Sequence, residues 1–358
     1  MATAPSGLGM MQRLPIRKIV LTVLSVFLIT AVLAGSISSL NKGIFSGTDW
    51  RNFVIDGLAQ GSLYALIALG YTLVYGILLM INFAHGEVFM AGAFTSFFFA
   101  RSMAESGFLN DAPYLSLPIL LLISMLTSTT IAVLLERIAY RPLRNAPRLV
   151  PLITAIGASL FLQYTFAGLY GTRVRAYPGF DFLQGSFSVF GVALSKRQMV
   201  VIISALLLML ALYYFVNKTK TGRAMRAVGE DKEIAGLMGI DVDRTIVLTF
   251  AIGGMLAGAA GILFAIKFQS GIQFTMGFIP GIKAFTAAVL GGIGNIIGAG
   301  IGGILLGLIE SIAPPLLLTG PGVDAPFQLK DVIAFSVLVF VLIFKPGGIL
   351  GSDEAEKV

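Results

Sequence analysis

The chain has 358 residues, of which 56% are hydrophobic and only 12% are charged, and its mean hydropathy is +0.90. Soluble domains carry about 25% charged residues, so this composition indicates a helical protein that crosses a membrane many times. The sequence shows no alternating strands with aromatic girdles, which argues against an outer-membrane barrel. The formal charge of +7 is typical of membrane proteins whose cytoplasmic loops are rich in Lys and Arg, so it requires no nucleic-acid partner. The chain has no cysteine and a single histidine, which excludes thiolate and multi-histidine metal sites. We therefore expect no cofactor.

The N-terminal region has two open interpretations. A polar basic stretch, Met1–Lys18, precedes the apolar run Ile19–Gly35, and the small residues Ala34-Gly35-Ser36 resemble the end of a cleaved signal peptide. A retained first span is favoured, because the later spans then give a consistent topology. We predict a leading segment over residues 1–52, a transmembrane domain over 53–351 and a short charged tail over 352–358.

Nine further apolar runs follow in chain order, and with the first run they give ten predicted spans. They are Phe53–Ile81, Val88–Ala100, Tyr114–Leu135, Leu149–Tyr170, Gln198–Val216, Thr245–Ile266, Phe278–Leu290, Ile293–Ile312 and Asp331–Phe344. The run Phe53–Ile81 exceeds the roughly 20 residues that cross a bilayer, so we expect it to tilt or break. A tight polar turn, Asn82–Glu87, separates it from the next run. Ten spans place both ends of the chain on one side, and the modest excess of basic residues there makes that side cytoplasmic.

The longest polar segment is Lys218–Arg244, which lies between two predicted spans and holds six basic residues. Its halves resemble two short helices: the first over Arg223–Val228, and the second capped by Asp231 and ended by Gly239. Such a capped pair is suited to docking onto a protein in the water. An ordinary positive-inside loop is the alternative that this segment leaves open.

Most of the 42 glycines lie inside the spans, where many are spaced by four residues. This spacing clears one helix face for the close approach of another backbone, and it serves either tight packing or helices that move against each other. The candidate packing glycines are Gly57, Gly61, Gly254, Gly258, Gly294, Gly298 and Gly302. The break at Gly291–Asn295 between two short apolar runs also resembles the discontinuous helices of transporters.

Ionisable residues within membrane spans are functional candidates by default. On the predicted topology Asp56 and Glu87 open spans at opposite faces, where both can reach interfacial water. Lys283 and Glu310 lie at similar depth, so they form either a structural ion pair or part of the transport path. His85 is interpreted as a hydrogen-bonding turn residue. The candidate path or gating residues are Asn82, Glu87, Lys283 and Glu310.

Three long stretches resemble the membrane permease of branched-chain amino acid ABC importers. They are GLAQGSLYALIALGYTLVYGILLMINFAHGEVFMAGAF (Gly57–Phe94), GRAMRAVGEDKEIAGLMGID (Gly222–Asp241) and GIKAFTAAVLGGIGNIIGAGIGGILLGLIES (Gly281–Ser311). The resemblance runs from about Gly57 to Gly351. It implies an all-α, polytopic permease of about ten membrane-embedded helices in the bacterial inner membrane.

The central loop is similar to the cytoplasmic Glu-Ala-Ala, three residues, Gly motif of ABC importers. Here the motif reads Glu233-Ile234-Ala235-Gly236-Leu237-Met238-Gly239, with Ile234 in place of the first alanine and without the downstream Ile-x-Leu-Pro ending. The resemblance implies that a helix with a small-residue face enters a cleft on an ATPase. The implied coupling residues are Arg223, Arg226, Glu230, Asp231, Glu233, Ala235 and Gly239.

The family resemblance also implies partners and a division of labour. The expected partners are a second related permease, two cytoplasmic ATP-binding subunits, a periplasmic amino-acid-binding protein and membrane lipid. The chain has no Gly-x-x-x-x-Gly-Lys-Ser/Thr motif, so we expect a transporter subunit that is not an ATPase itself. The expected substrate is a neutral, branched-chain amino acid. An importer of urea or short amides, and an ion-coupled secondary transporter, remain the alternatives.

Overall fold

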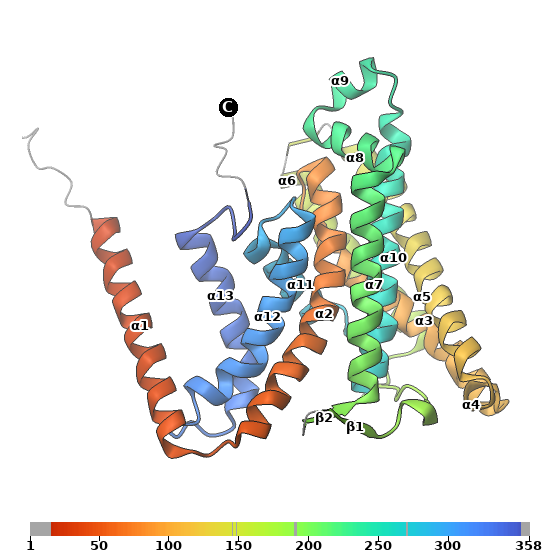
Figure 1. The fold of residues 1–358 in the computed structure, drawn as a ribbon. Coiled ribbons are helices and arrows are strands. Elements are labelled where there is room, and N and C mark those ends of the chain that lie inside the picture. Colours follow the sequence, from red (N-terminus) through yellow and green to blue (C-terminus); the bar gives the residue numbers. More distant parts are fainter. Residues whose placement is uncertain (1–15, 145, 148, 190–191, 270, 352–358) are drawn as a thin grey trace, which may run out of the picture.

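The computed structural model describes residues 16–144, 146–147, 149–189, 192–269 and 271–351. Ten long or medium helices form the membrane-embedded part of the chain (Figure 1): α1 (Ile16–Lys42), α2 (Gly47–Leu78), α3 (His85–Glu105), α5 (Pro113–Leu135), α6 (Leu149–Tyr170), α7 (Lys196–Lys218), α10 (Val242–Phe268), α11 (Phe278–Gly291), α12 (Ile296–Leu317) and α13 (Lys330–Phe344). Each of the ten predicted apolar runs corresponds to one of these helices, although Phe53–Ile81 extends past the end of α2 and Ile293–Ile312 begins before α12. The all-α prediction is therefore confirmed.

Eight of the ten helices, among the described residues, are long and apolar enough to cross a membrane on their own, and the other two are α3 and α11. A helix rises 1.5 Å per residue, so the 14 residues of α11 extend about 21 Å, less than a ~30 Å hydrocarbon core. The predicted count of ten spans is thus approximate, since eight helices of the described residues meet the length and hydropathy of a complete span.

Short elements close the two ends of the bundle. At one end lie α8 (Lys220–Glu230) and α9 (Lys232–Leu237), on the same side as the C-terminal end of α13 (Figure 1). At the opposite end, strands β1 (Ser186–Val189) and β2 (Val192–Ser195) form an antiparallel hairpin with Ser186 opposite Ser195. The remaining short elements are α4 (Phe108–Asp111), a π-helix (Glu136–Tyr140) and three 3-10 turns (Arg141–Leu143, Asp181–Leu183 and Pro326–Leu329).

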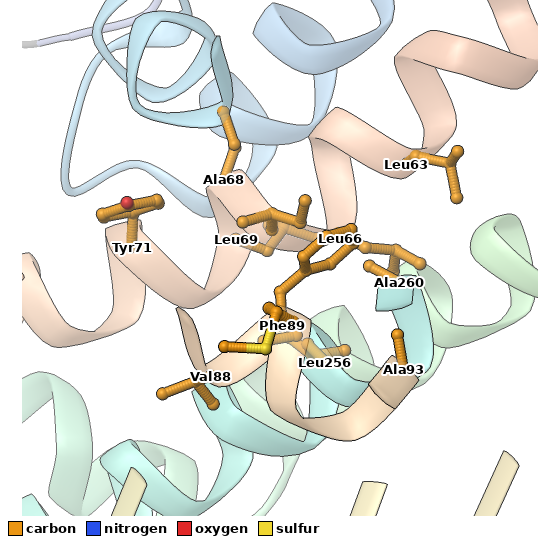
Figure 2. Packing of buried hydrophobic residues seen from close by; sticks show 14 of the residues in the cluster. Leu63, Leu66, Ala68, Leu69, Tyr71, Val88, Phe89, Ala93, Leu256 and Ala260 are labelled. Carbon is orange, nitrogen blue, oxygen red and sulfur yellow. The ribbon is translucent and has the colours of Figure 1, made fainter. Parts of the chain in front are cut away.

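The core of the bundle lies where α2, α3 and α10 meet. Figure 2 shows Leu66 and Leu69 of α2, Phe89 of α3, and Leu256 and Ala260 of α10 gathered in one cluster. All five side chains are buried. A long helix that is buried nearly all round, as α2 is, must be the central element of the bundle, because a peripheral helix keeps one face toward lipid.

Glycines create the closest helix contacts, as their spacing predicted. A Cβ on Gly61 of α2 would lie 2.7 Å from the Ile304 Cα of α12, and one on Gly57 would lie 2.9 Å from the Leu308 Cα. On α10, a Cβ on Gly254 would lie 2.6 Å from the Ala132 Cβ of α5. These approaches leave no room for a side chain, so α12 packs on α2 and α5 packs on α10 backbone to backbone.

The contact between α5 and α10 also contains hydrogen bonds. A Cβ on Gly258 would meet the Ser124 backbone carbonyl carbon at 2.8 Å, and the Ser124 hydroxyl donates to the Gly258 carbonyl oxygen at 2.6 Å. The Ser128 hydroxyl donates at 2.7 Å to the Val88 carbonyl oxygen near the start of α3. Serines of α5 thus bind the backbones of both neighbouring helices.

The predicted break between α11 and α12 is confirmed at Gly291–Asn295, where Asn295 caps α12 by accepting the Gly298 N–H at 3.0 Å. Gly298 and Gly302 pack against the backbone of α11. Gly294 does not belong to this packing face. Its φ of +94° and the open space around its Cβ position show that it serves the turn.

Helix α1 leans away from the bundle in Figure 1 and approaches it at its C-terminal end. There the Gly320 N–H donates to the Ser39 hydroxyl at 2.7 Å, and a Cβ on Gly35 would lie 3.1 Å from the Leu317 Cα. The predicted leading segment therefore contains a helix that contacts the end of α12. The polar residues before Ile16 and the tail 352–358 lie outside the described residues.

Candidate functional site

The central polar segment forms two capped helices, as predicted. The first begins earlier than expected, at Lys220 and not Arg223, because the Thr219 hydroxyl caps it by accepting the Gly222 N–H at 3.1 Å. In the second helix, the Asp231 carboxylate accepts the Ile234 N–H at 2.9 Å. Both helices therefore start from a fixed cap, which holds the pair in a defined shape.

Gly239 ends the second helix in the left-handed region, with φ +83°, as its position in the motif predicted. The Ile240 N–H returns to the Ala235 carbonyl oxygen at 3.0 Å, which is the hydrogen-bond pattern of a glycine-terminated helix. The short helix α9 is thus closed at both ends.

The outward face of α9 is apolar. Leu237 is 88% exposed, Met238 78% and Ile234 59%. Helix α9 lies at the tip of the molecule in Figure 1. Ala235 points inward and is buried. Ala235 therefore packs against the protein itself, whereas the other small residues of the motif, Gly236 and Gly239, are exposed. The surface that could enter a partner's cleft combines these glycines with large apolar side chains, which differs in part from the expectation drawn from the motif.

The charged residues predicted for this loop surround α9. Arg223, Glu230, Asp231 and Glu233 are exposed to water. Arg226 instead donates to the backbone carbonyl of Val216, near the end of α7. It therefore ties α8 to the membrane helix that precedes it.

An ionic cluster beside this loop is a feature that the sequence interpretation missed. Arg144 pairs with Glu136, whose side chain is fully buried in the π-helix, and with Asp243 in the first turn of α10. Arg141 also pairs with Asp243. Partial burial, together with the Arg144 charge, lowers the pKa of the Lys232 amino group in α9. The cluster links the α5–α6 connection to the place where the coupling loop enters α10.

Helix α3 begins deep inside the bundle. His85, its first residue, lies against α2 and α10, and Cβ atoms on Gly70 and Gly253 would both approach its imidazole. Its ring packs edge-on against Tyr71 at a centroid distance of 4.8 Å. The predicted turn Asn82–Glu87 is therefore shorter than expected, and His85 belongs to the first helical turn and not to the loop.

The connection before α3 is held by a buried hydrogen bond. The Tyr140 hydroxyl donates at 2.6 Å to the Asn82 side-chain oxygen, and both side chains are almost fully buried. Tyr140 is the last residue of the π-helix that also carries Glu136. The same short element thus contacts the ionic cluster at the membrane surface and the start of α3 within the membrane.

Glu87 does not reach interfacial water, contrary to the expectation from its place in the sequence. It is 1% exposed, and its Oε1 accepts from the Gln163 side-chain nitrogen at 2.7 Å and from the Ser159 hydroxyl at 3.3 Å. Both partners lie on α6. The sequence could not place Glu87, because the depth at which α3 begins depends on glycines in two other helices.

Lys283 and Glu310 form the predicted ion pair between α11 and α12. Lys283 also pairs with Asp331 of α13 at 2.6 Å, and the Tyr64 hydroxyl of α2 donates to Glu310 at 2.7 Å. Four helices therefore meet at this pair. Both charges of the pair are buried and each has a partner of opposite sign, as the cost of burial requires.

Asp56 also has a basic partner that the sequence interpretation missed. Its carboxylate pairs with Lys267 at 3.1 Å, near the end of α10. Asp56 is half exposed, whereas Lys267 is largely buried. This pair joins the outer ends of α2 and α10, consistent with the predicted outer position of Asp56.

Two cavities lie along the face shared by α6 and α11. The larger, about 620 Å³, is lined by Gln163 and Phe278 and extends to Lys283 and Asp331. The smaller, about 290 Å³, is almost entirely apolar apart from Tyr71 and Ser159. Leu160 and Phe278 line both, so the cavities adjoin. No group of three or more His, Cys, Asp and Glu residues suited to a metal ion occurs within the described part of the chain.

The candidate residues thus fall into three places. Asn82 and Glu87 flank the start of α3, Lys283 and Glu310 pair beside the larger cavity, and the coupling residues lie at the far end of the molecule. The cavity walls come mainly from α6, α11 and the segment before α11. No local pattern in the sequence marks these walls, because their apolar residues also suit lipid contact and their polar residues come from several distant segments.

Comparison with known proteins identifies relatives over most of the chain. The family described as "Branched-chain amino acid transport system / permease component" matches residues 53–342. The high-affinity branched-chain amino acid transport system permease proteins BraD of Pseudomonas aeruginosa and LivH of Escherichia coli are each 43% identical to this chain over 308 residues. The aligned part covers 85% of this chain, 97% of BraD and 96% of LivH. A probable branched-chain amino acid transport permease of Methanocaldococcus jannaschii is 31% identical over 313 residues, covering 85% of this chain and 93% of its own.

Proposed function

The chain belongs to the family of branched-chain amino acid transport permease components, and from this premise we propose that it carries neutral aliphatic amino acids across the bacterial inner membrane. It is an integral membrane subunit of an ABC importer. In the proposed complex it pairs with a second, related permease. Two cytoplasmic ATP-binding subunits drive the pair, and a periplasmic binding protein delivers the substrate.

The proposed path runs along the α6–α11 face, between the two permeases. This face holds both cavities, and α6 presents exposed apolar side chains beside them, including Ile153, Phe161 and Tyr164. The apolar lining of the smaller cavity suits an aliphatic side chain. The near-complete pairing of buried charges nearby suits a substrate with no net charge.

The exposed apolar tip of α9 is the observation that carries the proposed coupling. Three large apolar side chains, Ile234, Leu237 and Met238, project into water from a helix that is capped at both ends. Exposed apolar groups rimmed by charges mark protein interaction sites. In our proposal each permease inserts this tip into an ATPase, and closure of the ATPases on ATP moves α8 and the helices that contact it.

Alternating access would then follow from the glycine-lined contacts. Motion of the docked loop opens the cavity outward when ATP binds, and hydrolysis returns it inward. The glycine faces of α2, α10 and α12 allow one helix to shift against another without side-chain clashes.

Reconstitution of the four-part transporter in proteoliposomes, with labelled leucine and labelled urea supplied separately, tests this function. We expect leucine uptake that requires ATP and the binding protein and that persists after an ionophore abolishes the membrane potential. Uptake of urea in place of leucine would contradict the substrate class. Loss of uptake on abolishing the potential, at constant ATP, would contradict the ABC mechanism.

A further inference from the structure

The carboxylate of Glu87 has no charged partner within the described part of the chain. Its Oε1 accepts two hydrogen bonds from neutral donors, and its Oε2 accepts none. The salt bridges of the described residues include no Lys, Arg or His beside it, although the side chain is 1% exposed. Buried carboxylates are normally paired with a cation, so the Glu87 Oε2 is a hydrogen-bond acceptor whose donor is missing from the described residues.

The two residues that donate hydrogen bonds to Glu87 also line the cavities. Ser159 lines the smaller cavity and Gln163 lines the larger one. Glu87 therefore lies directly behind the wall where the cavities adjoin. A cationic group that entered between these two side chains would reach the carboxylate.

The smaller cavity beside Glu87 suits the hydrocarbon side chain of an aliphatic amino acid. The smaller cavity offers apolar walls from Phe83, Ile156 and Leu160, which suit a branched hydrocarbon chain. The unpaired Oε2 lies 2.9 Å from the Cβ position that Gly277 lacks, immediately before α11.

We propose that Glu87 receives the α-ammonium group of the transported amino acid, with the aliphatic side chain in the smaller cavity. This inference rests on the proposed function and adds the group by which the permease itself recognises the substrate. The required ligand carries a cationic amino group next to an apolar chain. A neutral amide or urea lacks that cation and gains no ion pair at this position.

The first test is the neutral, nearly isosteric substitution Glu87→Gln in the complete reconstituted transporter. A hydrogen bond to a charged group typically stabilises by about 1.5–3 kcal/mol, so we expect leucine uptake to fall roughly ten- to hundred-fold. The ATPase activity stimulated by loaded binding protein should persist, because docking is unchanged. Glu105→Gln is the matched control, since Glu105 is an exposed carboxylate of the same helix and should transport normally. Undiminished uptake by Glu87→Gln would overturn the proposal.

The second test leaves the protein unmutated. A hydrophobic carbodiimide labels buried carboxyl groups, and mass spectrometry of the purified complex, without binding protein, reports the labelling of Glu87. We expect leucine and 3-methylbutylamine, which both carry the amino group, to reduce labelling several-fold. The acid 4-methylpentanoate lacks that group and should leave labelling unchanged. Equal protection by all three compounds, or protection by the acid alone, would overturn the proposal.

These outcomes separate the inference from the proposed function. If wild-type proteoliposomes import leucine but neither Glu87→Gln nor the amino compounds have an effect, amino acid transport stands and the role of Glu87 falls. If the wild type imports urea and not leucine, the proposed function is wrong. The proposed role of Glu87 then falls with it, whatever the labelling experiment shows.

Discussion

Two buried carboxylates in this bundle have opposite surroundings. Glu310 pairs with Lys283 and accepts from Tyr64, and Lys283 has a second partner in Asp331. Glu87 is equally buried but binds only neutral donors and keeps one oxygen free. The comparison teaches that burial alone does not assign a role. We therefore expect a carboxylate whose charge is met within the fold to serve the structure, and one whose charge is unmet to be available to a ligand.

The largest expected effect comes from breaking the paired site. Lys283→Ala leaves the buried Glu310 without a basic partner, which typically costs about 3–5 kcal/mol, whereas Glu310→Ala leaves Lys283 with Asp331 as its remaining acidic partner and should cost less. We expect each single variant to reduce folded protein in the membrane, measured by size-exclusion chromatography of a fluorescent fusion. The double variant should recover part of the loss. Strictly additive losses would show that the two residues do not stabilise each other.

The next largest effect is expected in the close glycine contacts between helices. Gly298→Leu places a side chain against the backbone of α11, and overpacking costs about 1–3 kcal/mol. Insertion should persist, because hydropathy rises, but the complex should be held in one state with ATPase activity that no longer responds to loaded binding protein. Gly258→Ala also meets the Ser124 backbone, so even a methyl group should impair transport.

Gly300→Leu is the matched control for Gly298→Leu. The two positions are two residues apart on α12, but a Cβ on Gly300 would meet only the Met209 sulfur, at 3.8 Å. The Gly300→Leu variant should therefore transport normally. Normal transport by Gly298→Leu as well would show that its face is not a constrained contact, whereas failure of Gly298→Leu to accumulate would show that these glycines serve packing alone.

A smaller effect is expected at the docking loop, which lies outside the membrane. Gly239→Val forces a β-branched residue into the left-handed region, with a strain of roughly 1–2 kcal/mol. Uptake should fall while the protein still folds. Gly236→Ala is the control, because this glycine is helical and its Cβ position meets only Val242, at 3.9 Å. Wild-type uptake and ATPase association in Gly239→Val would contradict the docking role.

The smallest effect is expected from a charge that water already solvates. Arg141 is half exposed and pairs with the half-exposed Asp243, and such pairs stabilise by about 0.2–1 kcal/mol. Arg141→Ala should therefore change the unfolding temperature of the purified protein very little. Arg144→Ala should lower it more, since it also leaves the buried Glu136 unpaired. Equal effects of the two substitutions would contradict this difference.

The sequence predicted the helices well because apolar runs and glycine spacing are local signals. It also predicted the caps of α9, and it gave the Lys283–Glu310 ion pair as one of two interpretations, since opposite charges at similar depth can pair. It misplaced Glu87 because the start of α3 is set by the space that Gly70 and Gly253 leave for His85, which is a tertiary property. The inward orientation of Ala235 likewise depends on how α9 packs and could not follow from the motif.

The ionic cluster around Arg144 was missed for a related reason. Arg144 and Asp243 are about a hundred residues apart, and nothing in the basic loop marks one arginine as the partner of a buried acid. The cavities were missed because the residues that line them, such as Leu160 and Phe278, resemble lipid-facing residues in composition.

The most direct test of the contrast between the two carboxylates compares Glu87→Gln with Glu310→Gln in the same reconstituted complex, measuring unfolding temperature and leucine uptake for each. The account predicts that Glu310→Gln lowers the unfolding temperature clearly, because Lys283 loses a buried partner. It predicts that Glu87→Gln leaves the unfolding temperature at or above that of the wild type and reduces uptake at least roughly ten-fold. An equal loss of stability in the two variants, or full uptake by Glu87→Gln, would contradict it.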